Sequence, residues 1–104
     1  MEWGELRWTD AGAGGRRPVL ILTRPEALPY MRQVIVAPLT TTIRGLPSEV
    51  ELDQRDGVRR PCAVNLDSIQ LVSRDQIGRR IGVLGVAKLE EVRRALLRAT
   101  GFAP

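Results

Sequence analysis

The first 84 residues of this 104-residue chain consist of short β-strand patterns separated by turn signals, and this organisation constrains the fold most. The continuous β-branched and aliphatic run at 18–23 is typical of a strand buried on both faces. Residues 48–53 alternate polar and apolar side chains, which predicts a strand with one solvated face. Further strands are predicted at 6–9, 33–37, 61–66, 68–72 and 79–84, with Pro38 ending the one at 33–37.

The turns and the C-terminal segment complete the predicted fold. Asp56-Gly57 favours a positive φ and predicts an antiparallel hairpin with an extended loop, and Ser73 to Gln76 matches a capping box that opens a short helical turn. Residues 87–99 predict one α-helix, followed by Gly101 as a natural C-terminal cap. About six strands and a terminal helix predict one mainly β (α+β) domain over residues 1–104, a small, partly closed β-barrel with the helix outside. The apolar face of that helix consists of Leu89, Val92, Leu96 and Ala99.

The absence of histidine and the single cysteine exclude several kinds of chemistry. One chain without histidine and with only Cys62 cannot build a Cys/His zinc site, a Ser-His-Asp or Cys-His triad, or an internal disulfide. Cys62 lies in an apolar strand pattern and is predicted to be an inert core residue. Any hydrolytic chemistry must therefore proceed without an imidazole.

The chain is basic, with 16 Lys+Arg against 12 Asp+Glu and a formal net charge of +4. All basic residues except Lys88 are arginines, which suits a phosphate-bearing partner because a guanidinium binds phosphate bidentately. Arginine-rich genomic background would give the same composition. No apolar run approaches about 18 residues, and the charged N-terminus is unlike a signal peptide, so we expect a cytoplasmic protein without a membrane partner.

Three stretches of the sequence resemble the MazF/PemK family of toxin endoribonucleases. They are residues 4–8 (GELRW) with 17–22 (RPVLIL), residues 36–50 (VAPLTTTIRGLPSEV), and residues 56–67 (DGVRRPCAVNLD) with 79–82 (RRIG). Their order and spacing cover nearly the whole chain, and the middle stretch is the most specific. The resemblance implies an SH3-like β-barrel of the MazF/CcdB toxin type with a C-terminal helix, usually assembled as a homodimer. A dimer is also expected because a barrel this small gains stability by burying surface.

The resemblance also implies an activity. It is cleavage of single-stranded RNA at short sequences, without metal or other cofactor, to 2′,3′-cyclic phosphate and 5′-hydroxyl ends. Such toxins arrest growth and are neutralised by a cognate acidic antitoxin. The catalytic arginine of the family falls on Arg17, and its catalytic threonine or serine falls on Thr40.

The residue types at these two positions suit the chemistry. Attack of a ribose 2′-hydroxyl on its own phosphate develops negative charge, which a guanidinium at Arg17 can hold through two oxygens. Proton transfer from arginine is harder because its pKa exceeds about 12, so Arg17 is mainly a charge stabiliser. Thr40 can donate to the phosphate and fix the attack geometry. Without the resemblance, a solvated charge and a strand-end threonine would describe the two positions equally well.

Further RNA contacts are predicted around this pair, each with a plain structural alternative. Thr41, Thr42 and Arg44 lie in a polar segment that is either an RNA contact or a solvated hairpin loop. Asp67 and Ser68 fall where the family places polar residues near RNA bases, or else they cap a turn. Arg16 is a second candidate phosphate contact. Trp8 is predicted to be a core residue.

The first loop, residues 11–16, departs from the family. It is short and has no carboxylate, so the loop glutamate proposed as a proton acceptor in other members has no counterpart. Its glycines would let backbone amides approach a phosphate, or form a flexible surface turn. Two other functions stay open: a non-catalytic toxin on the same barrel that binds a protein such as a topoisomerase, and an RNA-binding barrel without catalysis.

Overall fold

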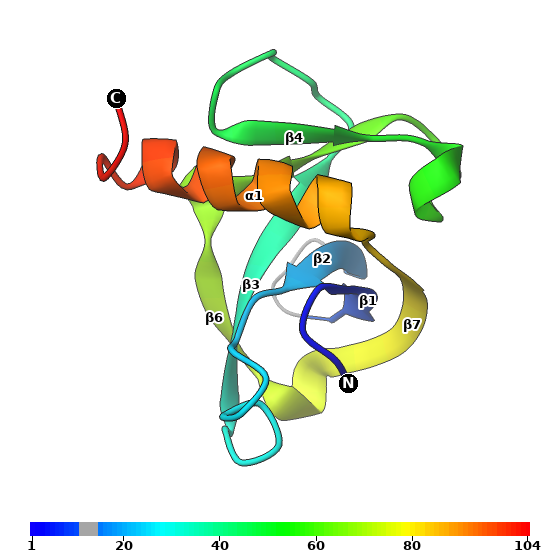
Figure 1. Ribbon diagram of the computed structural model, residues 1–104. Coiled ribbons are helices and arrows are strands. Elements are labelled where there is room, and N and C mark those ends of the chain that lie inside the picture. Colours follow the sequence, from blue (N-terminus) through cyan, green and yellow to red (C-terminus); the bar gives the residue numbers. More distant parts are fainter. Residues whose placement is uncertain (11–14) are drawn as a thin grey trace.

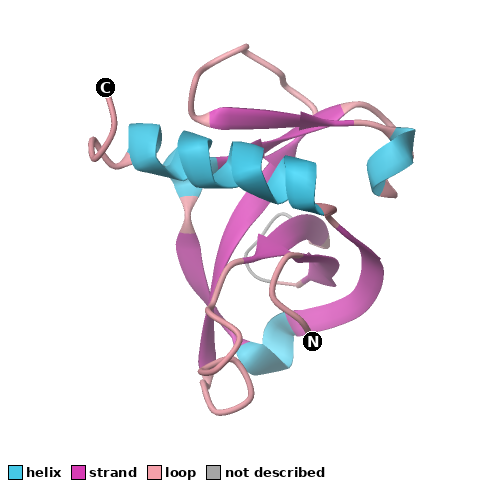
Figure 2. Cartoon of the chain, in the orientation of Figure 1, coloured by secondary structure: helices cyan, strands magenta, loops and turns pink. Residues whose placement is uncertain are grey.

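The computed structural model describes residues 1–10 and 15–104, in which strands of a curved sheet are followed by one α-helix (Figures 1 and 2). The strands are β1 (Glu5–Thr9), β2 (Arg17–Ile21), β3 (Gln33–Thr40), β4 (Glu49–Leu52), β5 (Cys62–Asn65), β6 (Gln70–Ser73) and β7 (Ile77–Val83). Short 3₁₀ turns are η1 (Gln54–Asp56), η2 (Leu66–Ser68) and η3 (Arg74–Gln76), and the helix is α1 (Val86–Ala99). In the described part of the chain, no helix has the length and apolar character needed to cross a membrane.

The strands form one antiparallel sheet in the order β4-β5-β3-β2-β1-β7, with β6 attached to β3 outside this path. The hydrogen-bonded path does not close on itself. In Figure 1, α1 runs beside β4 on one side of the sheet, and it packs against β4 and η2. The predicted architecture, a mainly β, partly closed barrel with an outer C-terminal helix, is confirmed.

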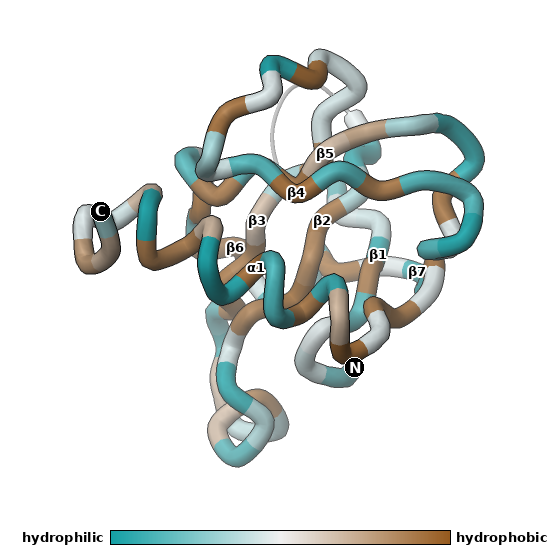
Figure 3. The backbone as a smooth tube through the Cα atoms, turned by 45° about the horizontal axis from the view of Figure 1, so that its top comes forward, coloured by the Kyte–Doolittle hydropathy of each residue, from teal (hydrophilic) through white to brown (hydrophobic). Residues whose placement is uncertain are grey.

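Strand β2 is buried on both faces, as its apolar run predicts. Leu20 belongs to a core cluster that also holds Val92 and Ala95 of α1. Val19 and Ile21, on the opposite face of the strand, belong to a second cluster with residues of β3 and β6. Along β4 hydrophilic and hydrophobic residues instead alternate (Figure 3), because only one of its faces is packed.

Strand β3 is longer than predicted, because it continues through Pro38 to Thr40. The expectation that proline ends this strand is therefore wrong. On one edge of β3, β6 pairs as far as Val36 and β5 pairs from Leu39 onward. Pro38 lies between these two ladders and pairs with Val19 of β2 on the other edge. On the edge shared by β5 and β6, Pro38 thus has no ladder partner, so its missing N–H costs no pairing there.

The predicted turns and caps are present. Strands β4 and β5 form the antiparallel hairpin, and Gly57 in its loop has φ +98°. The Ser73 and Gln76 side chains form the capping box of η3. Helix α1 begins at Val86, one residue before its predicted start, and Gly101, with φ +81°, follows its C-cap. Cys62 is buried in the core, and burial, together with the charge of Asp56, raises the pKa of its thiol.

A buried carboxylate, Glu5, joins β1 to β7. Its side chain is 3% exposed and lies 2.7 Å from Arg7 Nε and 3.2 Å from Arg80 Nε. Arg7 also donates to the carbonyl oxygen of Gly78 at 2.9 Å. Burial alone would raise the pKa of Glu5. The hydrogen bonds from Arg7 and from the Glu2 amide, together with the charge of Arg7, nevertheless hold it below its usual value.

Candidate active site

Arg17 and Thr40, which are 23 residues apart in sequence, lie at the ends of neighbouring strands, because Arg17 begins β2 and Thr40 ends β3. The antiparallel pairing of β2 with β3 ends with Val19 opposite Pro38, two residues from Arg17 and two residues from Thr40. On its other side, Arg17 pairs with Thr9 of β1. All three residues line one cavity.

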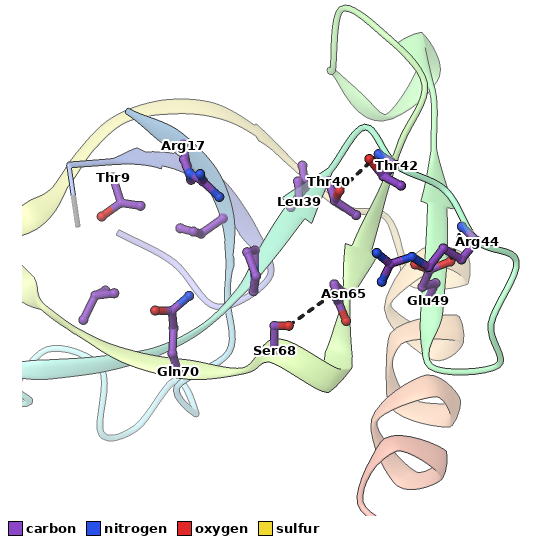
Figure 4. A pocket seen from close by; sticks show the side chains of 13 residues that line it. Thr9, Arg17, Leu39, Thr40, Thr42, Arg44, Glu49, Asn65, Ser68 and Gln70 are labelled. Atoms are coloured by element: carbon purple, nitrogen blue, oxygen red, sulfur yellow. Dashed lines mark hydrogen bonds between the residues drawn. The ribbon is translucent and has the colours of Figure 1, made fainter. Parts of the chain in front are cut away.

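The cavity is open and has a volume of about 370 Å³. Figure 4 shows Thr9 and Arg17 toward one end, Thr40 in the middle, and Arg44 with Glu49 toward the other end. Most of its lining residues have polar side chains. The lining residues are Thr9, Arg17, Val19, Pro38, Leu39, Thr40, Thr42, Arg44, Glu49, Asn65, Ser68, Gln70 and Val72.

The Thr40 hydroxyl is held in a fixed place by the chain that follows it. Its Oγ1 accepts a hydrogen bond from the Thr42 amide at 3.1 Å (Figure 4). A hydroxyl that accepts from an amide keeps its own hydrogen available for donation. Thr40 is half-buried at the cavity wall. It is therefore placed to donate to an anionic group inside the cavity.

The Arg17 side chain supplies positive charge to the same cavity. Arg17 is exposed, and within residues 1–10 and 15–104 no carboxylate forms an ion pair with its guanidinium. An unpaired guanidinium presents its fork of N–H donors to an incoming anion. A phosphate between Arg17 and Thr40 would receive both a charge and a hydroxyl donor.

Three of the remaining predicted contacts also line the cavity. Thr42 and Arg44 come from the segment after β3, and Ser68 comes from η2. Ser68 Oγ accepts from Asn65 Nδ2 at 3.1 Å, which fixes its position (Figure 4). Thr41 is exposed and lies outside the cavity lining.

Arg16 and Asp67 are engaged elsewhere. The Arg16 guanidinium carbon lies 5.1 Å from the centre of the Trp8 ring, in a cation–π contact. Trp8 is half-buried beneath it, so the expectation of a core tryptophan is wrong. Asp67 accepts a hydrogen bond from the buried Ser48 hydroxyl at 2.5 Å and ties η2 to the start of β4. Residues 11–14 of the first loop, with the amides considered for phosphate approach, lie outside the described residues.

Four polar lining residues, Thr9, Glu49, Asn65 and Gln70, were not singled out from the sequence. Of the lining residues, Glu49 alone carries a carboxylate. Its Oε1 accepts from the amides of Arg44 at 3.0 Å and Leu46 at 3.3 Å. The alternating pattern of residues 48–53 marks Glu49 as solvent-facing, but it does not show which loop or cavity that face meets.

Comparison with known proteins identifies relatives along almost the whole chain. The family described as PemK-like, MazF-like toxin of type II toxin–antitoxin system matches residues 3–100. The probable endoribonuclease MazF5 of Mycobacterium tuberculosis is 45% identical over 94 residues, which cover 89% of this chain and 86% of the relative. The probable endoribonuclease MazF2 of the same organism is 43% identical over 102 residues, covering 97% and 99% of the two chains.

Solved structures with the same fold also match almost the whole chain. The Mycobacterium tuberculosis toxin MazF-mt6 matches with a TM-score of 0.87 and 35% identity, over 93% of this chain and 96% of that one. A mycobacterial endoribonuclease in complex with its cognate antitoxin matches with a TM-score of 0.90 and 27% identity, over 100% and 98% of the two chains.

Proposed function

Because the chain belongs to the PemK-like, MazF-like toxins of type II toxin–antitoxin systems, we propose that its endoribonuclease site is the cavity between Arg17 and Thr40. The relatives are named endoribonucleases, which favours RNA cleavage over a non-catalytic toxin that acts by binding a protein. The observation that carries the assignment of the site is that Arg17 and Thr40, from the ends of the neighbouring strands β2 and β3, line one polar cavity.

The proposed reaction is attack by a ribose 2′-hydroxyl on the adjacent phosphorus of single-stranded RNA. The new bond joins the 2′-oxygen to phosphorus, and the bond from phosphorus to the 5′-oxygen breaks. The 2′-hydroxyl loses its proton and the leaving 5′-oxygen gains one, so the products are a 2′,3′-cyclic phosphate and a 5′-hydroxyl. Charge builds up on the non-bridging phosphate oxygens during this step, and these oxygens are where Arg17 would act.

Arg17 and Thr40 have different roles in this scheme. A guanidinium remains protonated at neutral pH, so Arg17 stabilises the developing charge through paired N–H donors. Thr40 donates its hydroxyl hydrogen to the same phosphate and holds it in line for attack, since its own oxygen is fixed by the Thr42 amide. Ser68 and Gln70, on the wall formed by η2 and β6, are placed to meet the bases that flank the reacting phosphate.

RNA cleavage in excess EDTA tests this proposal. Wild-type protein should cut cellular RNA under these conditions and leave 5′-hydroxyl ends, whose mapping also gives the cleavage sequence. Arg17→Ala should lower kcat/KM by about 10²–10³, the cost of losing one strong donor to a developing oxyanion. The matched control is Arg59→Ala, an exposed arginine outside the cavity lining. Cleavage that requires an added metal ion, or an Arg17→Ala variant that retains full activity, would contradict the mechanism.

We also propose two partners. An acidic antitoxin segment should cover the basic cavity, in keeping with the related endoribonuclease solved with its cognate antitoxin. The chain should form a homodimer, because a 104-residue domain buries a smaller share of its surface on folding than a larger domain does. Sedimentation of the free protein distinguishes one copy from two. We propose that the toxin acts in the cytoplasm, because its proposed substrate is cellular RNA.

A further inference from the structure

We propose that Glu49 is a positioning residue that fixes the segment 41–47, here called the β3–β4 loop, so that Arg44 stands at the far end of the cavity from Arg17. This inference rests on the proposed function, since it concerns how the same cavity holds RNA. Glu49 begins β4 and lines the cavity. In Figure 4 its side chain lies beside that of Arg44, on the side away from Arg17.

Three hydrogen bonds connect Glu49 to the β3–β4 loop. Its Oε1 accepts from the Arg44 amide at 3.0 Å and from the Leu46 amide at 3.3 Å. Its own backbone amide donates to the carbonyl oxygen of Leu46 at 3.0 Å. Hydrogen bonds to an ionised carboxylate are about twice as strong as neutral ones. One carboxylate oxygen therefore gathers two loop amides at a single point.

Gly45 makes this convergence possible. It lies between the two donating amides and has φ +69°, a backbone conformation that side chains rarely adopt. A turn of this kind brings successive amides toward one anionic acceptor. A Cβ at Gly45 would meet no atom within 4 Å, so its need for glycine comes from the backbone alone.

The loop has little apolar packing to hold it otherwise. Every residue from 41 to 47 is exposed, including Ile43 at 37% and Leu46 at 42%. Its order comes from hydrogen bonds at its two ends, to Thr40 Oγ1 at the start and to Glu49 at the finish. Both anchors are themselves cavity residues. Loop conformation and cavity shape are thus set by the same side chains.

The consequence for RNA follows from the position of Arg44. Because Arg17 and Arg44 stand at opposite ends of the cavity (Figure 4), they meet different parts of a bound strand. Arg17 is assigned to the reacting phosphate, so Arg44 is assigned to a neighbouring phosphate. A loop released from Glu49 must be ordered again on binding, which weakens binding more than the chemical step.

The test compares four variants in steady-state cleavage of an RNA oligonucleotide that carries a site mapped with the wild type. Glu49→Ala removes the carboxylate that accepts the two loop amides, and Gly45→Ala disfavours the positive φ that brings these amides together. Each substitution should raise KM about tenfold while kcat changes less than about threefold. Glu49→Gln keeps an oxygen that accepts both amides and should recover most of the affinity. Glu51→Ala is the matched control, because Glu51 lies on the same face of β4 and is exposed.

Amide hydrogen exchange supplies a readout that does not depend on activity. The Arg44 and Leu46 amides should be protected in the wild type, in Glu51→Ala and in Glu49→Gln, and should exchange at least about tenfold faster in Glu49→Ala. Thermal unfolding of each variant excludes global loss of structure.

Three results would overturn the proposal. An unchanged KM in Glu49→Ala would show that the loop does not serve binding. Protected loop amides in Glu49→Ala would show that Glu49 does not hold them. A Glu49→Gln variant with protected amides but the weak binding of Glu49→Ala would assign the effect to charge instead of position. If the wild-type protein cleaves no RNA, the proposed function itself is refuted, and this outcome differs from the three results above.

Discussion

Replacing the buried Glu5 by glutamine should destabilise the fold far more than replacing the exposed Glu90 in the same way. The two carboxylates make ion pairs of equal length, since Glu5 lies 2.7 Å from Arg7 and Glu90 lies 2.7 Å from Arg93. They differ in burial, with side-chain exposures of 3% for Glu5 and 49% for Glu90. The comparison therefore contrasts a buried carboxylate, held by Arg7 and Arg80, with a solvated one that pairs with Arg93.

The expected magnitude for Glu5→Gln follows from its partners. Removing one member of a buried ion pair costs about 3–5 kcal/mol, because the remaining charge stays in a poorly solvated place. Arg80 is 52% exposed and can turn toward water, whereas Arg7 is 22% exposed and stays beside the glutamine. The lower end of the range, about 3 kcal/mol, is therefore expected. At about 4–8 °C per kcal/mol for a domain of this size, Tm should fall by roughly 12–24 °C.

The pH dependence of this difference identifies its source. The folded pKa of Glu5 lies below its ordinary value of 4.5, so the ionised form is favoured in the folded state. The resulting stability is fully present above that ordinary value and is lost as the pH falls through the lower folded pKa. The gap in Tm between wild type and Glu5→Gln should therefore be constant near neutral pH and should shrink below about pH 4.5.

Thermal unfolding at equal protein concentrations measures these effects, because an associating chain has a concentration-dependent Tm. Glu90→Gln should leave Tm unchanged within the reproducibility of the scan, since a solvated ion pair contributes little. Equal decreases in Tm for Glu5→Gln and Glu90→Gln would show that burial does not determine how much the ion pair stabilises the fold. A gap between wild type and Glu5→Gln that persists undiminished at pH 3 would show that ionisation of Glu5 is not its origin.

Three further predictions concern the site, the hairpin and the partner. Thr40→Val, which removes the hydroxyl and keeps the shape, should lower kcat by about 10²-fold, while Thr40→Ser keeps most of the activity. Gly57→Ala should destabilise the fold by about 1–2 kcal/mol in urea unfolding, because Gly57 has φ +98°. The affinity of the acidic antitoxin for this +4 chain should fall as salt rises from about 50 to 500 mM, as titration calorimetry would show. An affinity that does not change with salt would indicate an apolar interface.

Local patterns in the sequence predicted the strands, turns and helix well, because each depends on residues close in the chain. The capping box at Ser73 and Gln76, the turn at Gly57 and the face of α1 are of this kind. The prediction that Pro38 ends β3 is wrong because a proline disrupts a strand only where its N–H would bond to a neighbouring strand. Which strands pair with β3 at Pro38 depends on residues far away in sequence. The prediction that Trp8 lies in the core is wrong because its ring is half-buried and lies against the guanidinium of Arg16.

The site was predictable only in part. The resemblance named Arg17 and Thr40, and the pairing of β2 with β3 supplies the physical reason why both reach one cavity. Glu49, Asn65 and Gln70 were missed because glutamate on a solvated strand face, or an amide beside a turn, is common in any β protein. A signal for Glu49 does exist in the sequence. An acidic residue four positions after Gly45 can reach back to the amides beside the glycine, and the structure shows that it does.

The cavity itself arises from the way β3 is shared between two partners. Its first half, from Gln33 to Val36, pairs with β6, and its last two residues pair with β5. The chain passes from β5 to β6 through η2, so the sheet divides at this edge and leaves a gap beside the end of β3. Thr40 ends β3 beyond this division, where β3 pairs with β5. η2 and β6 supply the lower wall of the cavity in Figure 4, and the β3–β4 loop supplies the far end.

A fully paired β3 would have one continuous ladder along this edge. The missing N–H of Pro38 falls in the interval between the two ladders, where a proline causes no loss of pairing. The residue that seemed to end a strand therefore marks the place where the sheet divides. Around the cavity, this histidine-free chain collects two arginines, threonine and serine hydroxyls, and amide side chains.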